Sequence, residues 1–227
     1  MRQGRDRGEG SSKGSDAAAI FDAKCTRCPR LATHLADLRV SHPTYFNAPV
    51  PSFGRLDARL LIVGLAPGMH GANATGRPFT GDFAGILLYA SLHRLGLASA
   101  PQSTAVDDGL ELIDCRITNA VKCLPPQNKP TTAEANTCND WLREELARSS
   151  ARVVFALGSI AHRAVLRAGG LRLADHPFGH GARHELGDGR FLIDSYHCSR
   201  YNTQTRRLTE DMFVDALQAA RAAAFKL

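Results

Sequence analysis

Two pairs of cysteines constrain the fold of this chain more than any other feature. Cys25 and Cys28 are separated by two residues near the start, and Cys123 and Cys138 by fourteen residues in the middle of the sequence. A single CxxC pair is compatible with redox chemistry, but a second pair with a short insert favours a four-thiolate site. Such a site holds either tetrahedral zinc or an iron–sulfur cluster, and the spacing does not choose between them. The alternative is four buried structural thiols.

Composition indicates a globular, intracellular protein. The 227 residues, 44% of them hydrophobic, suffice for one well-buried α/β domain, and we interpret the remaining Cys115 and Cys198 as small apolar core residues. No apolar run of membrane-spanning length and no secretory segment is present, which predicts a cytoplasmic protein with no membrane partner. Reduced thiols then favour metal ligation over disulfides. The net charge of +6 permits a polyanionic partner but equally fits a solvated basic surface.

The first sixteen residues differ in character from the rest. Residues 1–16 contain Gly, Ser and charged residues with Met1 as the one apolar side chain, so they cannot bury enough surface to offset the entropy of ordering. We therefore predict a disordered tail over 1–16 and a single domain over 17–227.

Apolar runs and amphipathic segments alternate along the body. The expected strands cover 58–64, 116–121, 152–157 and 190–196, and the expected helices cover 82–97, 131–148, 160–168 and 209–225. The helix expected over 131–148 opens with Thr-Thr-Ala-Glu, which is typical of a capping box. This alternation predicts an α/β fold with a mostly parallel sheet of about four strands and helices on both faces.

Polar side chains follow the ends of these strands, where ligands bind in parallel sheets. The first strand leads into GLAPGMHGANATGRPFTGD (64–82), which matches neither a Walker A loop nor GxGxxG. The second ends near Asn119, and the fourth is followed by His197. One crevice could therefore hold Phe79, Asp82, Asn119 and His197, a set suited to stacking a planar heterocycle, reading its polar edge and assisting bond cleavage.

With these motifs the chain resembles a uracil-DNA glycosylase of the iron–sulfur-containing B type (family 5). The resemblance rests on the four-cysteine spacing, the 64–82 loop, TNAVKC (118–123) and SYHCSRYNTQTRRLT (195–209), all in the same order. It implies a three-layer α/β/α sandwich and a [4Fe–4S] cluster on Cys25, Cys28, Cys123 and Cys138, with zinc as the less favoured metal. It also implies hydrolytic removal of uracil, and often of other deaminated bases, from DNA.

Each pocket residue has a role in this interpretation and an ordinary structural alternative. Phe79 would stack on the extruded base or be a core aromatic, and Asn119 would pair with the O4/N3 edge of uracil or end a strand. His197 would donate to O2 as negative charge develops, or be a hydrogen-bonded structural histidine. Asp82 would stabilise the oxocarbenium-like sugar and orient water, or cap the following helix.

The first motif departs from that of the better-known uracil-specific enzymes, which carry an acidic residue and a bulky Tyr beside its Pro. Ala66 cannot activate water, and Gly68 has no side chain that would exclude larger bases. We therefore expect a roomier pocket that also accepts hypoxanthine, xanthine or etheno adducts. His70 and Asn73 either line this pocket or stabilise its loop.

Basic residues after the fourth strand suit contact with DNA. Arg200, Arg206 and Arg207 can meet phosphates, Asn202 lies among them, and Tyr201 or Arg200 could fill the gap left by a flipped base. We further interpret Arg77 as a phosphate ligand or the partner of a loop carboxylate, and Lys122 and Lys129 as available for phosphates. We expect a monomer that acts on DNA; a damage-binding protein without catalysis and a hydrolase of free nucleotides are the alternatives.

Overall fold

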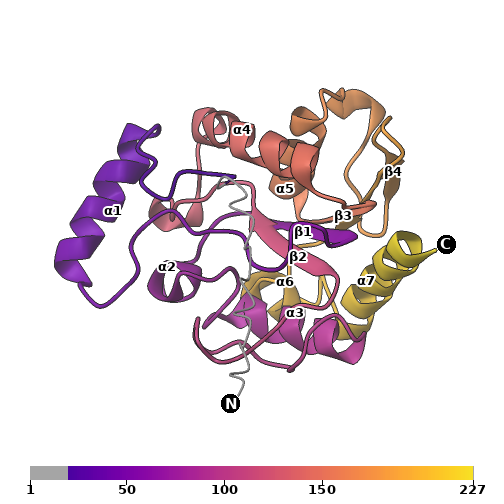
Figure 1. Ribbon diagram of the computed structural model, residues 1–227, viewed down its shortest axis with the longest axis horizontal. Coiled ribbons are helices and arrows are strands. Elements are labelled where there is room, and N and C mark those ends of the chain that lie inside the picture. Colours follow the sequence, from indigo (N-terminus) through magenta and orange to yellow (C-terminus); the bar gives the residue numbers. More distant parts are fainter. Residues whose placement is uncertain (1–19, 227) are drawn as a thin grey trace, which may run out of the picture.

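A five-stranded sheet forms the centre of the computed structural model, which describes residues 20–226 (Figure 1). The strand order is β2-β1-β3-β5-β4. The strands are β1 (Leu60–Gly64), β2 (Cys115–Asn119), β3 (Val153–Leu157), β4 (Arg183–Glu185) and β5 (Phe191–Ser195). All neighbours pair in parallel except β4, which is antiparallel to β5 at one edge. The predicted mostly parallel sheet is confirmed, with five strands instead of about four; the tail predicted over 1–16 lies outside the described residues.

The strands form where the sequence has short apolar runs. Every residue of β1 and of β3 is buried, as expected for parallel strands covered on both faces. Successive side chains point to opposite faces, so Leu60 and Ile62 enter one core while Leu61 and Val63 enter the other. The four strands expected from the sequence coincide with β1, β2, β3 and β5 to within two residues at each end.

Helices cover both faces of the sheet and complete a three-layer α/β/α sandwich. Helices α3 (Phe83–Arg94) and α7 (Glu210–Phe225) pack on one face, and α4 (Thr132–Arg148) and α5 (Ser159–Ala168) on the other (Figure 1). Cys115 and Cys198 are buried in the core, as predicted. Within residues 20–226, no helix combines the length and apolar character needed to cross a bilayer.

Capping side chains determine where the helices begin. Thr131 accepts from the backbone N–H of Glu134, whose side chain accepts in return from the backbone N–H of Thr131, which confirms the predicted capping box of α4. Asp82 caps α3, which ends at Arg94 before Gly96 in the left-handed region (φ 70°), earlier than the predicted 97.

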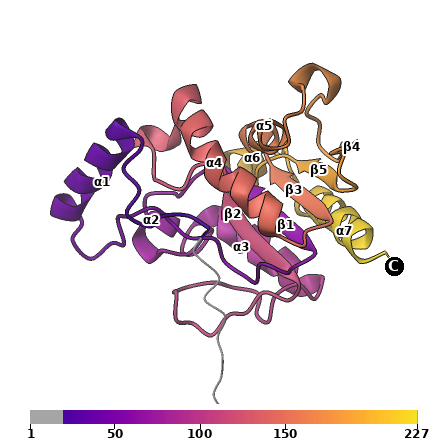
Figure 2. The ribbon, with the colours of Figure 1, turned by 45° about the horizontal axis from the view of Figure 1, so that its top comes forward.

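Helix α1 (Pro29–Ser41) stands away from the sheet at one end of the molecule in both views (Figure 2). It buries Leu31, Leu35 and Leu38 against the segment that follows β2, with Leu124 at the centre of the contact. This helix was not anticipated from the sequence, nor were the short helices α2 (Ala72–Thr75) and α6 (Arg200–Gln204) and the 3-10 turns Pro126–Asn128 and Leu173–Asp175. An ion pair between Arg30 of α1 and Glu134 of α4, 2.7 Å apart, adds to this apolar contact.

The fully buried carboxylate of Glu145, on α4, forms ion pairs with two cationic side chains. Its oxygens lie 2.7 Å from Arg116 Nε and 3.3 Å from Lys122 Nζ, and Thr118 donates to it at 2.8 Å. Although burial alone would raise its pKa, Lys122 and Arg116 lower the pKa of Glu145 to about 2. Lys122 is 3% exposed, so the prediction that it is available for DNA phosphates is wrong; its basic side chain balances Glu145 instead.

We predict that Glu145→Gln lowers the free energy of unfolding by about 3 kcal/mol at pH 7, because the buried Lys122 and the partly buried Arg116 lose their counter-charge. The advantage of the wild type is fully present above pH 4.5, the ordinary pKa of a glutamate, and declines as the pH falls towards about 2. Urea unfolding measures it. Glu144→Gln, a half-exposed neighbour on α4, serves as the control, with a change below about 0.5 kcal/mol; equal midpoints for the two variants would contradict the prediction.

Candidate active site

A cleft of about 1050 Å³ opens at the carboxyl ends of the parallel strands. The chain leaves β1 for β2 on one side and later returns to β3 on the other side, so the strand order reverses at β1 and β3. Ligand crevices of α/β sheets form at such a switch point. Residues that follow the strand ends line the cleft: Leu65, Ala66 and Gly68 after β1, Gly158 and Ser159 after β3, and Tyr196 and His197 after β5, with Asn119 at the end of β2.

Parallel pairing of β1 and β2 sets Gly64 directly beside Asn119. A Cβ atom at Gly64 would lie 2.4 Å from Asn119 Oδ1 and 2.6 Å from the Phe79 ring, so glycine is required for these side chains to share the floor of the cleft. Asn119 is 4% exposed, and its Oδ1 has no hydrogen-bond partner in the described part of the chain. Buried acceptors are nearly always satisfied, so an unpartnered oxygen on a residue that lines the cleft makes Asn119 a candidate for binding a ligand.

Phe79, which lines the cleft, holds an unusual backbone conformation. Its φ of 55° lies in the left-handed region, which is rare for a bulky residue and typical of functional sites. The ring is 6% exposed and lies 6.0 Å from the His197 ring, with 29° between the ring planes. Phe79 therefore belongs both to the hydrophobic core and to the cleft wall.

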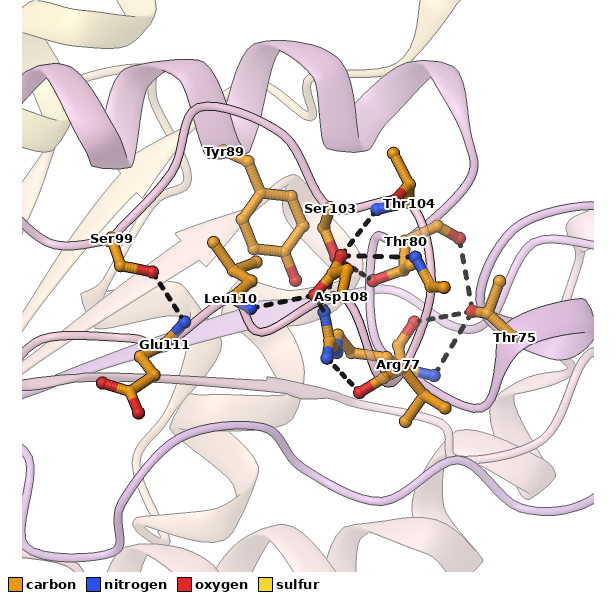
Figure 3. Close-up of polar contacts among 12 residues, drawn as sticks. Thr75, Arg77, Thr80, Tyr89, Ser99, Ser103, Thr104, Asp108, Leu110 and Glu111 are labelled. Atoms are coloured by element: carbon orange, nitrogen blue, oxygen red, sulfur yellow. Dashed lines mark hydrogen bonds and ion pairs between the residues drawn. The ribbon is translucent and has the colours of Figure 1, made fainter.

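Arg77 anchors the loop that carries Phe79 (Figure 3). Its guanidinium contacts Asp108 at 2.6 Å and Ser103 at 3.0 Å, and it also donates to the Val106 carbonyl. Burial alone would raise the pKa of Asp108, but Arg77 and three backbone N–H groups hold that pKa well below its usual range. Of the two roles considered for Arg77, the structure shows the partner of a loop carboxylate.

Two further hydrogen bonds fix the residues on either side of Phe79. The Tyr89 hydroxyl donates to the Pro78 carbonyl at 2.8 Å. The Thr80 hydroxyl lies 2.7 Å from that of Ser103 (Figure 3). Burial raises the pKa of Tyr89 to about 12, so its hydroxyl remains a donor at neutral pH. Helix α3 and the 99–111 loop thus both hold Phe79 in its strained conformation.

Asp82 presents one oxygen to the helix and the other to the cleft. Its Oδ1 accepts from the Gly85 backbone N–H at 2.9 Å, as an N-cap does. Its Oδ2 lies close to two glycines. A Cβ atom added to Gly71 would lie 2.4 Å from this oxygen, and one added to Gly68 would lie 3.4 Å from it. Burial raises the pKa of Asp82 despite hydrogen bonds from Gly85 and Ala84, which makes its carboxylate more basic than an exposed one.

His197 also lines the cleft, beside the Phe79 ring. Burial lowers the pKa of its imidazole to about 4. The Asn202 amide donates to the His197 carbonyl at 2.8 Å, which ties this residue to α6. At neutral pH the ring therefore carries one N–H donor and one acceptor nitrogen.

Of the remaining predicted pocket residues, some line the cleft and one does not. Ala66, Gly68 and His70 line the cleft, and His70 Nδ1 lies 2.9 Å from the Tyr45 hydroxyl. Asn73 does not line it: this side chain is fully buried and donates to Asn47 Oδ1 at 2.8 Å. Of its two anticipated roles, stabilisation of the loop is the one that these contacts support.

The segment after β5 forms the rim of the cleft. Arg200, Tyr201 and Asn202 of α6 line it together with Arg207, whose guanidinium lies 4.6 Å from the centre of the Tyr196 ring. Tyr201 is 71% exposed. Arg206 is exposed but does not line the cleft, and its φ of 57° turns the chain at the end of α6.

Several cleft residues were not anticipated from the sequence, namely Phe83, Asn128, Gly158, Ser159, Phe178 and Tyr196. Gly158 and Ser159 directly follow β3, so the rule of strand ends that selected Asn119 could have found them. Phe178 comes from an irregular loop with no local signal, and only packing on Tyr196, 6.2 Å between ring centres, places it there.

All four cysteines of the two pairs line one small cavity between α1, α4 and the end of β2. Among residues 20–226, no three of these sulfurs lie within 4.8 Å of one another. Burial, followed by the nearby Cys138, Cys25 and Cys28, raises the pKa of Cys123 to about 12. The backbone N–H of Lys122 donates to Cys138 Sγ at 3.3 Å. Four thiols lining one cavity could hold a soft metal centre, but no three of their sulfurs are as close together as those around a single ion.

Comparison with known proteins agrees with the fold and the cleft. Residues 51–221 match the model of the uracil DNA glycosylase superfamily. The chain is 48% identical over 203 residues to a type-5 uracil-DNA glycosylase of Thermus thermophilus, covering 87% of this chain and 92% of that protein. It is 44% identical over 202 residues to a type-5 enzyme of Pyrobaculum aerophilum, covering 87% and 88%. A type-4 uracil-DNA glycosylase of the same organism is 36% identical over 129 residues, or 56% of this chain and 58% of that protein.

The α/β/α sandwich with its cleft at the strand ends defines the class, and these matches define the family. The chain belongs to the uracil DNA glycosylase superfamily, in its type-5 group. The family resemblance stated from the sequence is therefore confirmed.

We predict that the His197 imidazole stays neutral until the pH falls to about 4. Because histidine in the unfolded chain binds a proton near pH 6.5, the unfolding free energy should fall as the pH drops from about 6.5 to about 4. NMR titration of histidine-labelled protein measures the pKa, and His197→Gln assigns the signal. Titration of this ring near pH 6.5 would contradict the prediction.

Proposed function

We propose that this protein hydrolytically excises uracil from DNA and leaves an abasic site. The observation that carries the proposal is the unpartnered Asn119 Oδ1 in a cleft shared with Phe79, Asp82 and a neutral His197. The type-5 relatives are named uracil-DNA glycosylases, which supports the same activity. A base inside a duplex cannot reach such a cleft, so the target nucleotide is flipped out before cleavage.

Recognition of the base depends on the floor of the cleft. The Asn119 amide accepts from the uracil N3–H through the unpartnered Oδ1 and donates to O4 through its NH₂ group. Cytosine carries an unprotonated N3 and an amino group at the corresponding edge, so both hydrogen bonds would fail. The Phe79 ring packs against the flat face of the base from one side of the cleft.

Bond cleavage depends on two groups on opposite sides of the sugar–base bond. As the base departs, its O2 gains negative charge, and the single N–H of neutral His197 donates to it. The sugar becomes positively charged, and the Asp82 carboxylate stabilises it while Oδ2 orients the attacking water. Burial makes this carboxylate a better proton acceptor, which suits it to take the water proton.

The rim of the cleft supplies contacts to the DNA backbone. Arg200 and Arg207 line the opening and Arg206 is exposed beside them, within a chain of net charge +6. Such cations bind phosphates without reading sequence and position the duplex. Tyr201, 71% exposed at the same rim, is our candidate for filling the gap that the flipped base leaves, and the adjacent Asn202 holds the rim to His197.

We also propose a [4Fe–4S] cluster on Cys25, Cys28, Cys123 and Cys138. Sulfurs around a single zinc ion at about 2.3 Å would lie about 3.8 Å apart, closer than these cysteines are grouped, whereas a cluster of several atoms needs wider spacing. A cluster held by these cysteines would link the start of α1, α4 and the end of β2, and hydrolysis would need no electrons from it. It would add to the small apolar contact and the Arg30–Glu134 ion pair that hold α1 to the body.

Asp82→Asn should lower the single-turnover rate on a uracil-containing duplex by about 10²-fold or more. Asparagine caps helices about as well as aspartate, so this variant separates the charge of Asp82 from its capping of α3. Asp37→Asn, at an exposed position of α1, is the matched control and should keep the wild-type rate. A full rate in Asp82→Asn with an unchanged melting temperature would remove the carboxylate from the mechanism.

Gly68→Tyr should narrow the pocket, which we propose accepts hypoxanthine, xanthine or etheno adducts besides uracil. A Cβ at Gly68 would lie 3.4 Å from Asp82 Oδ2, an ordinary contact, so the substitution adds a ring without moving the backbone. We expect activity on hypoxanthine to fall at least tenfold relative to uracil. Gly68→Ala controls for the added Cβ. An unchanged ratio of the two activities in Gly68→Tyr would refute the role of Gly68.

Cys25→Ser should remove iron and lower the yield of folded protein more than the specific activity of the folded fraction. Cys115→Ala, a core cysteine outside the set, should retain the iron content of the wild type. Iron analysis, visible absorption and single-turnover assays measure these effects. A Cys25→Ser protein that is folded, iron-loaded and as stable as the wild type would contradict the ligand set.

A further inference from the structure

Three metal-ligating side chains meet on the α5 side of the sheet, outside the residues that line the cleft. His162 comes from α5, His184 from β4 and Asp194 from β5. One ligand atom from each lies within 4.8 Å of the other two. The side chains of His162 and Asp194 are 2% and 0% exposed, and that of His184 is 11% exposed.

The protein alone leaves some hydrogen-bonding atoms of these three side chains without partners. His162 Nδ1 lies 2.9 Å from Asp194 Oδ1, and His162 Nε2 lies 2.9 Å from the His176 carbonyl. A carbonyl only accepts, so Nε2 carries a proton; if Nδ1 also donates, the ring is a buried cation. His184 Nε2 and Asp194 Oδ2 lie 3.4 Å apart without the alignment of a hydrogen bond, and neither has a hydrogen-bond partner in the described residues.

We propose that His162, His184 and Asp194 bind a divalent transition-metal ion, most readily Zn²⁺. The cation would accept the lone pairs of His162 Nδ1 and His184 Nε2 and the charge of Asp194. His162 would then need only its Nε2 proton, which it donates to the His176 carbonyl. A metal-binding histidine usually donates its second nitrogen to a carbonyl or carboxylate in this way. Two imidazoles with one carboxylate suit zinc among the common metals.

Such an ion would stabilise the wall of the cleft that Phe178 forms. It would join α5 to the β4–β5 hairpin, and through His162 it would hold the loop of His176. Phe178 in the same loop lines the cleft, and its ring centre lies 5.5 Å from that of His162. The metal would act by positioning this wall and would touch neither the base nor the sugar.

Zinc content tests the site on the intact, iron-loaded protein. Wild type, His184→Gln and His93→Gln are incubated with ZnCl₂, desalted and analysed for zinc per chain. We expect one equivalent in the wild type and in His93→Gln, an exposed histidine of α3, and at least tenfold less in His184→Gln. Equal zinc in all three proteins, or none in the wild type, would overturn the proposal. His162, His184 and Asp194 would then form only a buried ion pair.

X-ray absorption at the zinc edge of the wild type gives an answer that does not depend on a variant folding. Nitrogen and oxygen neighbours at about 2.0–2.1 Å are expected, whereas sulfur at about 2.3 Å would place the zinc on the cysteines and contradict the assignment. Neither readout uses glycosylase activity, so the site stands or falls separately from the proposed function.

Discussion

The parallel register of β1 and β2 is the constraint on which the site depends. It places Gly64 opposite Asn119, and the missing side chain of Gly64 is the space that the Asn119 amide and the Phe79 ring occupy. Any larger residue at this position would displace one of the two. The positions of the Asn119 amide and the Phe79 ring in the cleft therefore follow from one pairing in the centre of the sheet, where neither strand can shift without unburying its apolar residues.

A second layer of buried polar contacts holds the loop between β1 and α3 in shape. The buried Arg77 forms an ion pair with Asp108, whose side chain is 13% exposed, and Tyr89 donates to the carbonyl of the residue before Phe79. These contacts offset the cost of a left-handed phenylalanine, on the order of 1–3 kcal/mol. They also fix the start of α3, so that Asp82 caps the helix with one oxygen and faces the cleft with the other. One segment of chain thus positions both the Phe79 ring and the Asp82 carboxylate that we propose to be catalytic.

Features set by local pattern were predictable from the sequence. Apolar runs located four strands, and the rule that ligands bind at strand ends selected Asn119, His197 and the 64–82 loop. Features set by distant contacts were not. Strand β4 has only three residues, none of them buried, and its place at the edge depends on pairing with β5. Lys122 follows a strand and is charged, which is typical of a surface residue. Its side chain is nevertheless buried, because it pairs with Glu145 of α4.

The most direct test is to incubate purified protein with a labelled duplex carrying one uracil and with deoxyuridine monophosphate in parallel. The base released is measured by chromatography, and abasic sites are measured by alkaline cleavage. The proposed mechanism predicts free uracil and an abasic site from the duplex, and no release from the monomer, which lacks the neighbouring phosphates that Arg200 and Arg207 bind. Binding to the duplex without release of uracil would leave a damage-binding protein, and release from the monomer alone would indicate a nucleotide hydrolase; either result contradicts the account.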